Sequence, residues 1–156
     1  MSLVNVQDIM TKEVISVHPD MPLLEAAKIL SERNFDGVPV VDTDNKLVGI
    51  LTEYDLISKE SMIHLPTFQK ILQNIKVFKK DQSEFQKEIQ EISLLVVRDV
   101  MNTDPLTLGE QATFMEVLDA FRNHHRVNPI PVIDSDRRVV GVVSRFDILK
   151  PLHALS

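Results

Sequence analysis

The chain of 156 residues is 44% hydrophobic and 26% charged, which is the composition of one ordinary globular domain or of two small domains that share a core. Its net charge of −6 and its single Tyr without any Trp exclude a duplex-DNA binder with a basic face and a single-strand binder with an aromatic platform, so no nucleic-acid partner is expected. The absence of Cys excludes disulfides and thiolate metal sites, and the lack of a signal peptide or a membrane-length apolar run predicts a cytoplasmic protein without a membrane partner.

The first 58 residues alternate between patterns typical of strands and of helices. A β-branched run ends in a turn around Pro19, and apolar residues then recur at helical spacing after Pro22, a residue that suits the first turn of a helix. Two almost wholly apolar runs follow and indicate two strands buried on at least one face. The expected elements are a strand at Val14–Val17, a helix from Pro22 through Leu30, strands at Val38–Asp42 and Leu47–Leu51, and a helix that begins at Glu53.

Residues 59–96 are too many for a connecting loop and carry two amphipathic patterns. One apolar stripe spans Phe68–Ile75, the other spans Phe85–Ile92, and the polar run Lys79–Ser83 separates them. These patterns predict an inserted helical hairpin. Its apolar stripes are expected either to pack on the neighbouring core or to form a surface for a partner or a second copy of the chain.

Residues 97–156 repeat the pattern of residues 1–58. In the longer matching segment, seven of twenty positions are identical, and the second copy has one extra residue in the loop that precedes this segment. Repetition of this length predicts an α/β protein of two β-α-β-β-α units, separated by the insertion at 59–96. The matching segments are Val6–Met10 with Val97–Met101, and Val38–Ile57 with Ile130–Leu149.

Two motifs recur in both units. The pattern Pro-Val-hydrophobic-Asp begins at Pro39 and at Pro131, and the pattern Gly-x-x-Thr/Ser-x-x-Asp begins at Gly49 and at Gly141. Together with the repeated Val-x-Asp-x-Met entry, they make the chain resemble a tandem cystathionine β-synthase (CBS) domain pair, often called a Bateman module. The resemblance implies that the two units pack about a pseudo-twofold axis, that two clefts lie between them, and that the module forms a homodimer.

The glycine-containing motif places a hydroxyl and an acid where a strand gives way to a helix. Thr52 and Ser144 are expected at helix N-termini, where free N–H groups and a hydroxyl favour phosphate oxygens. Asp55 and Asp147 follow three residues later and can accept hydrogen bonds from the hydroxyls of a ribose. The alternative is that all four residues are helix caps and first-turn acids without a ligand. The resemblance implies phosphate contacts for the hydroxyl residues and ribose contacts for the acids.

The resemblance also implies that the opposite unit supplies the adenine slot of each cleft. Asp36 and Asn128 stand where family members often have basic residues before the second strand. We expect Arg126, slightly upstream, to reach phosphates in the Asp55 cleft, and Asp36 to make the other cleft suit an uncharged or cationic adenosine derivative better than a polyphosphate. The implied slot residues are Val14, Ile15, Asp36, Gly37 and Val38 for the Asp147 cleft, and Pro105, Leu106, Asn128, Pro129 and Ile130 for the Asp55 cleft.

These features predict a regulatory module that senses an adenosine-containing metabolite such as AMP, ADP, ATP or S-adenosylmethionine. No spacing suggests a catalytic triad or a Gly-rich phosphate loop, and the pair His124–His125 lacks a third ligand, so an enzyme, a resident cofactor and a metal site are all unexpected. The alternative is a ligand-free module for dimerisation or docking, with an effector protein or a fused domain as its partner.

Overall fold

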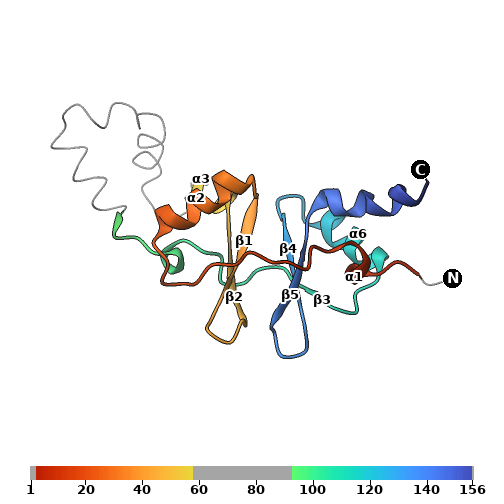
Figure 1. Ribbon diagram of the computed structural model, residues 1–156, viewed down its shortest axis with the longest axis horizontal. Helices are drawn as coiled ribbons and strands as arrows, with labels where there is room; N and C mark the ends of the chain where they lie inside the picture. Colours follow the sequence, from red (N-terminus) through yellow and green to blue (C-terminus); the bar gives the residue numbers. More distant parts are fainter. Residues whose placement is uncertain (1–2, 58–92, 156) are drawn as a thin grey trace.

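The computed structural model of the chain describes residues 3–57 and 93–155. The helical hairpin expected over 59–96 lies outside the described residues, except for its last four positions. Figure 1 shows two halves in which a β-hairpin stands next to the hairpin of the other half, with helices on the outer sides. This arrangement is the pair of α/β units that the sequence repeat predicts.

Each half contains most of the elements that the periodicities predict, and the exception is the strand expected at Val14–Val17. The first half contains α1 (Val6–Ile9), α2 (Leu23–Arg33), β1 (Gly37–Val41), β2 (Leu47–Thr52) and α3 (Glu53–Ile57). The second half contains the 3-10 helix η1 (Val97–Asp99), β3 (Leu108–Gly109), α6 (Phe114–Asn123), β4 (Ile130–Ile133), β5 (Val139–Val143) and the 3-10 helix η2 (Arg145–Leu155). β1 pairs antiparallel with β2, and β4 pairs antiparallel with β5 and parallel with β3. None of the described helices is both long and apolar enough to cross a lipid bilayer.

The first strand of each unit is shorter than its sequence suggests. The prediction of a strand at Val14–Val17 is wrong for most of its length, because only Val17 pairs, in an isolated parallel bridge with Val40. Val14 packs instead against the small apolar cluster between the two hairpins. In the second unit the matching strand, β3, has two residues. Packing between the units therefore overrides the local preference for an extended strand.

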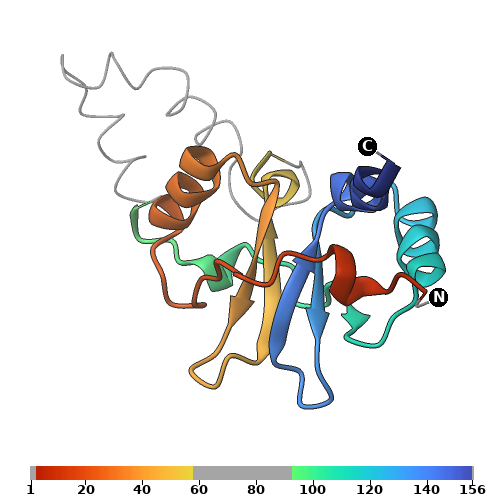
Figure 2. The ribbon, with the colours of Figure 1, turned by 45° about the vertical axis from the view of Figure 1, so that its right-hand side comes forward.

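The entry segment of each unit packs in the core of the other unit. Val6 and Ile9 of α1 are buried with Phe121 and Ile130 in the second unit, whereas Val97 of η1 is buried in the core of the first. In Figure 2 the red segment with α1 accordingly lies beside the helices of the second unit, and the green segment with η1 lies beside α2. Each core is thus incomplete without residues from the other repeat.

Backbone hydrogen bonds attach each entry segment to the second hairpin strand of the opposite unit. Thr11 exchanges two N–H···O bonds with Val142 of β5, at 2.9 and 3.0 Å. Asn102 exchanges two with Ile50 of β2, at 2.9 and 3.0 Å. The entry segments therefore cross in space the division that the sequence predicts between residues 58 and 97.

A glycine stands at each of these crossings. A Cβ on Gly49 would lie 2.7 Å from the carbonyl oxygen of Asn102 and 2.9 Å from Sδ of Met101. A Cβ on Gly141 would collide with Sδ of Met10 and lie 2.9 Å from its Cγ. Because any side chain would displace the entry segment, the glycine of the repeated motif serves the close approach of two backbones.

The tips of the two hairpins also bind each other. The Leu47 N–H donates to the carbonyl of Arg137 at 2.9 Å, and the Val139 N–H donates to the carbonyl of Asn45 at 3.1 Å. Asn45 and Arg137 both adopt a left-handed conformation, with φ 64°. The motif acid Asp42 accepts two N–H groups of the turn that follows it, each at 2.9 Å. This acid therefore shapes the hairpin tip and is not part of a cleft.

Replacing Gly49 with Ala is expected to destabilise the protein more than replacing Gly141 with Ala. At Gly49 the new methyl group meets a backbone carbonyl, whereas at Gly141 it meets mainly a flexible methionine side chain. Overpacking costs about 1–3 kcal/mol, so the Tm of Gly49→Ala should fall by roughly 3–10 °C. Gly109→Ala is the control, because no atom lies within 4 Å of its added Cβ. A control that unfolds at the same temperature as Gly49→Ala would contradict this explanation.

Candidate functional site

Two clefts open between the units and are called the Asp55 cleft and the Asp147 cleft. Their volumes are about 550 and 420 Å³, respectively, within the range of roughly 300–1,000 Å³ that is typical of small-molecule sites. Residues of both units line each cleft, and Asn128 and Pro129 line both. A ligand in either cleft would therefore contact both units.

Thr52 and Asp55 cap each other where β2 meets α3. Oδ2 of Asp55 accepts hydrogen bonds from the N–H and the hydroxyl of Thr52, both at 2.9 Å, and the Asp55 N–H donates to Oγ1 of Thr52 at 3.2 Å. These are the capping contacts that the sequence leaves as the alternative to ligand contacts. Oδ1 of Asp55 accepts no hydrogen bond from any described residue, so half of this carboxylate is available to a ligand.

Burial raises the pKa of the Asp55 carboxyl above its ordinary value of 3.8, although the hydrogen bonds from Thr52 oppose the shift. The pKa of the adjacent Glu53 is also raised. Its largest cause is burial, which a hydrogen bond from the Tyr54 N–H opposes, and the negative charges of Asp36 and Asp55 add to the increase. Asp55, which lines the cleft, and Glu53, which does not, are therefore carboxyl groups without a cationic partner among the described residues.

Asp147 occupies the equivalent place in the second unit but has a different partner. Its Oδ2 accepts from the N–H of Ser144 at 2.8 Å, and its Oδ1 lies 2.9 Å from the Lys150 ammonium. The same ammonium donates to the carbonyl of Ile9, at the end of α1, at 2.7 Å. Asp147 is 8% exposed, and both of its oxygens are occupied. Two acids that are equivalent in sequence thus differ in their free acceptor capacity.

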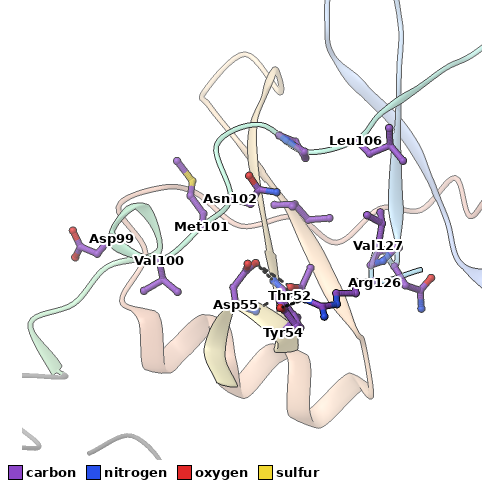
Figure 3. A pocket seen from close by; sticks show the side chains of 14 residues that line it. Thr52, Tyr54, Asp55, Asp99, Val100, Met101, Asn102, Leu106, Arg126 and Val127 are labelled. Atoms are coloured by element: carbon purple, nitrogen blue, oxygen red, sulfur yellow. Dashed lines mark hydrogen bonds between the residues drawn. The ribbon is translucent and has the colours of Figure 1, made fainter. Parts of the chain in front are cut away.

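Arg126 reaches the Asp55 cleft from the loop between α6 and β4. Its Nη1 donates to the Tyr54 hydroxyl at 2.7 Å, and its Cζ lies 5.5 Å from the centroid of the Tyr54 ring. Figure 3 shows Arg126 next to Tyr54, Thr52 and Asp55, although the arginine comes from the opposite unit. Among the described residues that line this cleft, Arg126 is the one with a cationic side chain.

The Asp147 cleft has a more acidic lining. Glu13, Asp36 and Asp147 contribute to it, and none of its described lining residues is basic. Asp36 accepts a hydrogen bond from the side-chain amide of Asn128 at 2.6 Å, which joins the two units between the clefts. A negatively charged ligand is therefore better accommodated in the Asp55 cleft than in the Asp147 cleft.

Most residues that the resemblance implies for the adenine slots do line a cleft. Val38 and Ile130 do not, because they are 1% and 0% exposed and belong to the two cores. Side chains alternate along a strand, so Gly37 and Pro39 line the Asp147 cleft while Val38 points into the core. Val14 also lies elsewhere, in the cluster between the hairpins. The predicted residues that line the Asp147 cleft are Ile15, Asp36, Gly37, Ser144 and Asp147. Those that line the Asp55 cleft are Thr52, Asp55, Pro105, Leu106, Arg126, Asn128 and Pro129.

The second entry segment is a part of the site that sequence reasoning misses. Asp99, Met101 and Asn102 line the Asp55 cleft, because this segment crosses to β2 of the first unit. Tyr54, between the motif residues Thr52 and Asp55, is also missed. The repetition of the entry pattern marks the segment as important, but the pattern carries no sign of the crossing.

The histidines of the loop after α6 have no companion ligands nearby. Within residues 3–57 and 93–155, no cluster of three or more His, Asp or Glu side chains could hold a metal ion. Nδ1 of His124 lies 2.9 Å from the carbonyl oxygen of Ala120, one turn earlier in α6. This histidine therefore contributes to the end of the helix.

Comparison with known protein families identifies the same domain in both repeats. The family model of the CBS domain matches residues 6–61 and 97–154. The CBS domain pair of protein MJ0100, solved in complex with 5′-methylthioadenosine and S-adenosyl-L-methionine, is 26% identical to the chain. Their structures align with a TM-score of 0.67 over 99% of this chain and 100% of that chain.

Two curated proteins are similar to this chain in sequence, at 30% and 29% identity. L-aspartate semialdehyde sulfurtransferase of Methanocaldococcus jannaschii is 30% identical over 143 residues, which are 92% of this chain and 22% of that protein. The chloroplastic CBS domain-containing protein CBSX1 of Arabidopsis thaliana is 29% identical over 148 residues, which are 93% of this chain and 62% of that protein. The chain therefore spans less than two thirds of the length of either relative.

Asp55→Asn is expected to raise the stability of the protein at pH 7, whereas Asp147→Asn should lower it. The pKa of Asp55 is raised in the folded state, so the fold favours the protonated acid. The stabilisation that results is complete below pH 3.8, and it is lost as the pH rises through the raised pKa. Asn keeps a neutral acceptor for Thr52 without that loss. Asp147→Asn instead leaves the Lys150 ammonium without its carboxylate, at a cost of about 1–3 kcal/mol.

Thermal unfolding of both variants and the wild type between pH 7 and pH 4 measures these effects. The advantage of Asp55→Asn should shrink toward pH 4, because the wild-type acid then becomes protonated as well. An advantage that does not depend on pH, or a loss of stability at pH 7, would contradict the argument for Asp55.

Proposed function

Because the chain belongs to the CBS domain family, with one domain in each half, we propose that it is a regulatory module that binds an adenosine-containing metabolite between its two units. The observation that carries the proposal is the Asp55 cleft. It joins an acid with an unoccupied oxygen to an arginine from the opposite unit. Such a cleft suits a ligand that offers hydroxyl donors to the acid and negative charge to the arginine.

An adenosine phosphate has both of these features. Its ribose hydroxyls can donate to Asp55, and its phosphate can accept charge-assisted hydrogen bonds from Arg126. Pro105 and Leu106 add an apolar wall that suits a base. The solved complex of the MJ0100 domain pair with two adenosine derivatives supports this ligand class. We therefore assign AMP, ADP or ATP to the Asp55 cleft.

The Asp147 cleft suits a different adenosine derivative. Glu13 and Asp36 line it, and the Lys150 ammonium already occupies Asp147. A phosphate would meet negative charge there, whereas an uncharged ligand or a sulfonium such as S-adenosylmethionine would not be repelled. Because the ribose hydroxyls would have to compete with Lys150, the Asp147 cleft should bind its ligand more weakly than the Asp55 cleft.

The proposed regulation follows from the position of the clefts between the units. A ligand that bridges both units binds one relative orientation best, and it shifts the population toward that orientation by its difference in affinity. None of the described cleft residues is a His or a Cys, and we assign no catalytic step to the chain. The read-out by an effector protein or a fused domain, and a cytoplasmic setting, stay predictions.

We further propose that a homodimer forms through the apolar face of η2. Phe146, Leu149, Leu152 and Leu155 are 82%, 48%, 57% and 82% exposed. Their spacing of three residues aligns them on one face, because a 3-10 helix has three residues per turn. Pro151 lies within η2 and disfavours an α-helix, in which this face would be spread around the axis. A second copy of the chain is the partner that the family resemblance implies.

Addition of AMP at 100 times its dissociation constant is expected to stabilise the wild-type protein by about 2.7 kcal/mol, which raises Tm by roughly 5–10 °C. Asp55→Asn should lose at least about tenfold in AMP affinity, because the amide replaces one carboxylate acceptor with a donor. Asp44→Asn, in an exposed hairpin turn, is the matched control. No thermal response to AMP, ADP, ATP or S-adenosylmethionine would favour a ligand-free docking module.

Leu149→Glu combined with Leu152→Glu is expected to convert a dimer into a monomer, because the charges would be buried at the contact. Sedimentation velocity of the wild type and the double variant measures this change. Leu3→Glu is the control, since Leu3 is exposed outside the proposed interface. A wild-type protein that sediments as a monomer would refute the assignment of this face.

A further inference from the structure

The helix α6 ends without the left-handed cap that ends α2. In α2 the cap residue Asn34 has φ 54°, and its N–H donates back to the helix. The equivalent loop of the second unit is one residue longer, and its first residue, His124, has φ −132°. The longer loop is therefore held by other contacts, the first of which is the hydrogen bond from the Val127 N–H to the carbonyl of His124 at 3.2 Å.

Arg145 provides further contacts to this loop. Its Nη2 lies 3.0 Å from the carbonyl oxygen of His124, 2.5 Å from that of His125 and 3.4 Å from that of Val127. Its guanidinium lies over the ring of Phe121 at the end of α6, with Cζ 5.3 Å from the centroid. One side chain therefore holds the whole added loop, since its contacts begin in α6 and end next to β4.

Arg145 is at the same time the residue that follows Ser144 in the motif of the second unit. Its N–H donates to Oδ1 of Asn128 at 3.0 Å, which ties the motif to the loop a second time. Glu53 has the equivalent place in the first unit, where its carboxylate accepts from the N–H of the adjacent Tyr54. An ionised carboxylate cannot donate to carbonyl groups, so the side-chain connection between motif and loop is formed in the second unit. In the first unit the backbone supplies the connection, because the Glu53 N–H donates to the carbonyl of Asp36 at 2.9 Å.

The loop that Arg145 holds carries the arginine of the Asp55 cleft. Arg126 lies between His125 and Val127, whose carbonyl groups both contact Arg145. From there its guanidinium reaches the hydroxyl of Tyr54 in the first unit. A shift of the loop would therefore move the Arg126 guanidinium, the cationic group among the described lining residues, out of this cleft.

We propose that Arg145 is a positioning residue that makes the Asp55 cleft prefer phosphorylated ligands, because it holds Arg126 in place. The preference for a phosphate rests on the proposed function, whereas the positioning of Arg126 is a property of the protein without ligand. The two parts are therefore tested by different measurements.

The first measurement is the fluorescence of Tyr54, which is the single tyrosine of a chain without tryptophan. Its emission reports the contact with the Arg126 guanidinium. Arg145→Met should change the emission as much as Arg126→Met does, and the double variant should show no further change. Arg122→Met, which removes an exposed arginine of α6, is the control and should leave the emission unchanged. Wild-type emission in Arg145→Met would overturn the proposal.

The second measurement is the affinity for AMP and for adenosine by calorimetry. Arg126→Met and Arg145→Met should each weaken AMP about tenfold or more and change adenosine by less than about twofold, with no added loss in the double variant. Equal losses for both ligands would show that Arg145 has a merely structural role. If the wild type binds neither ligand, the proposed function fails together with the phosphate preference, and Tyr54 emission still decides the positioning.

Discussion

The exchange of entry segments between the two units is the constraint on which the rest of the structure depends. α1 completes the core of the second unit and η1 completes the core of the first, and both crossings run over a glycine that leaves room for a second backbone. Asn102 connects the exchanged segment to the site. Its backbone pairs with Ile50, and the residue also lines the Asp55 cleft. The backbone pairs that attach the entry segments to the hairpins are formed by residues that also line the clefts, so the same contacts join the units and shape the clefts.

A nearly symmetric backbone carries two sites with different chemistry. In both units the motif acid accepts the N–H of the preceding hydroxyl residue. The difference comes from two residues of the second repeat, because Lys150 neutralises Asp147 while Arg126 enters the cleft of Asp55 from a loop with one added residue. Duplication thus supplies a pair of equivalent clefts, and single side chains around them give each cleft a distinct charge.

The sequence predicts the helices and strands, but it does not predict the contacts between residues that are far apart in the chain. Helical and strand periodicities locate the elements because burial of one face depends on neighbours a few residues away. The capping box at the start of α6 is equally local, since Thr113 and Glu116 form it three residues apart. Val14 and Val38 are placed in a cleft by position in the family pattern, but strand alternation and the contact between hairpins bury them elsewhere. The bond from Lys150 to the carbonyl of Ile9 and the bonds from Arg145 to the loop after α6 could not be predicted, since only the folded chain brings these carbonyl groups near.

The exchanged segments also govern the order in which the chain can fold during its synthesis. The first unit emerges from the ribosome before Val97, so its core lacks one buried valine until η1 is made. The core around α1 is completed later still, because the strands β4 and β5 that cover Val6 and Ile9 are translated after the whole first unit. The two domains therefore cannot complete their packing strictly one after the other. Cleavage of the chain between the repeats would yield two fragments, each of which lacks core residues that the other contains.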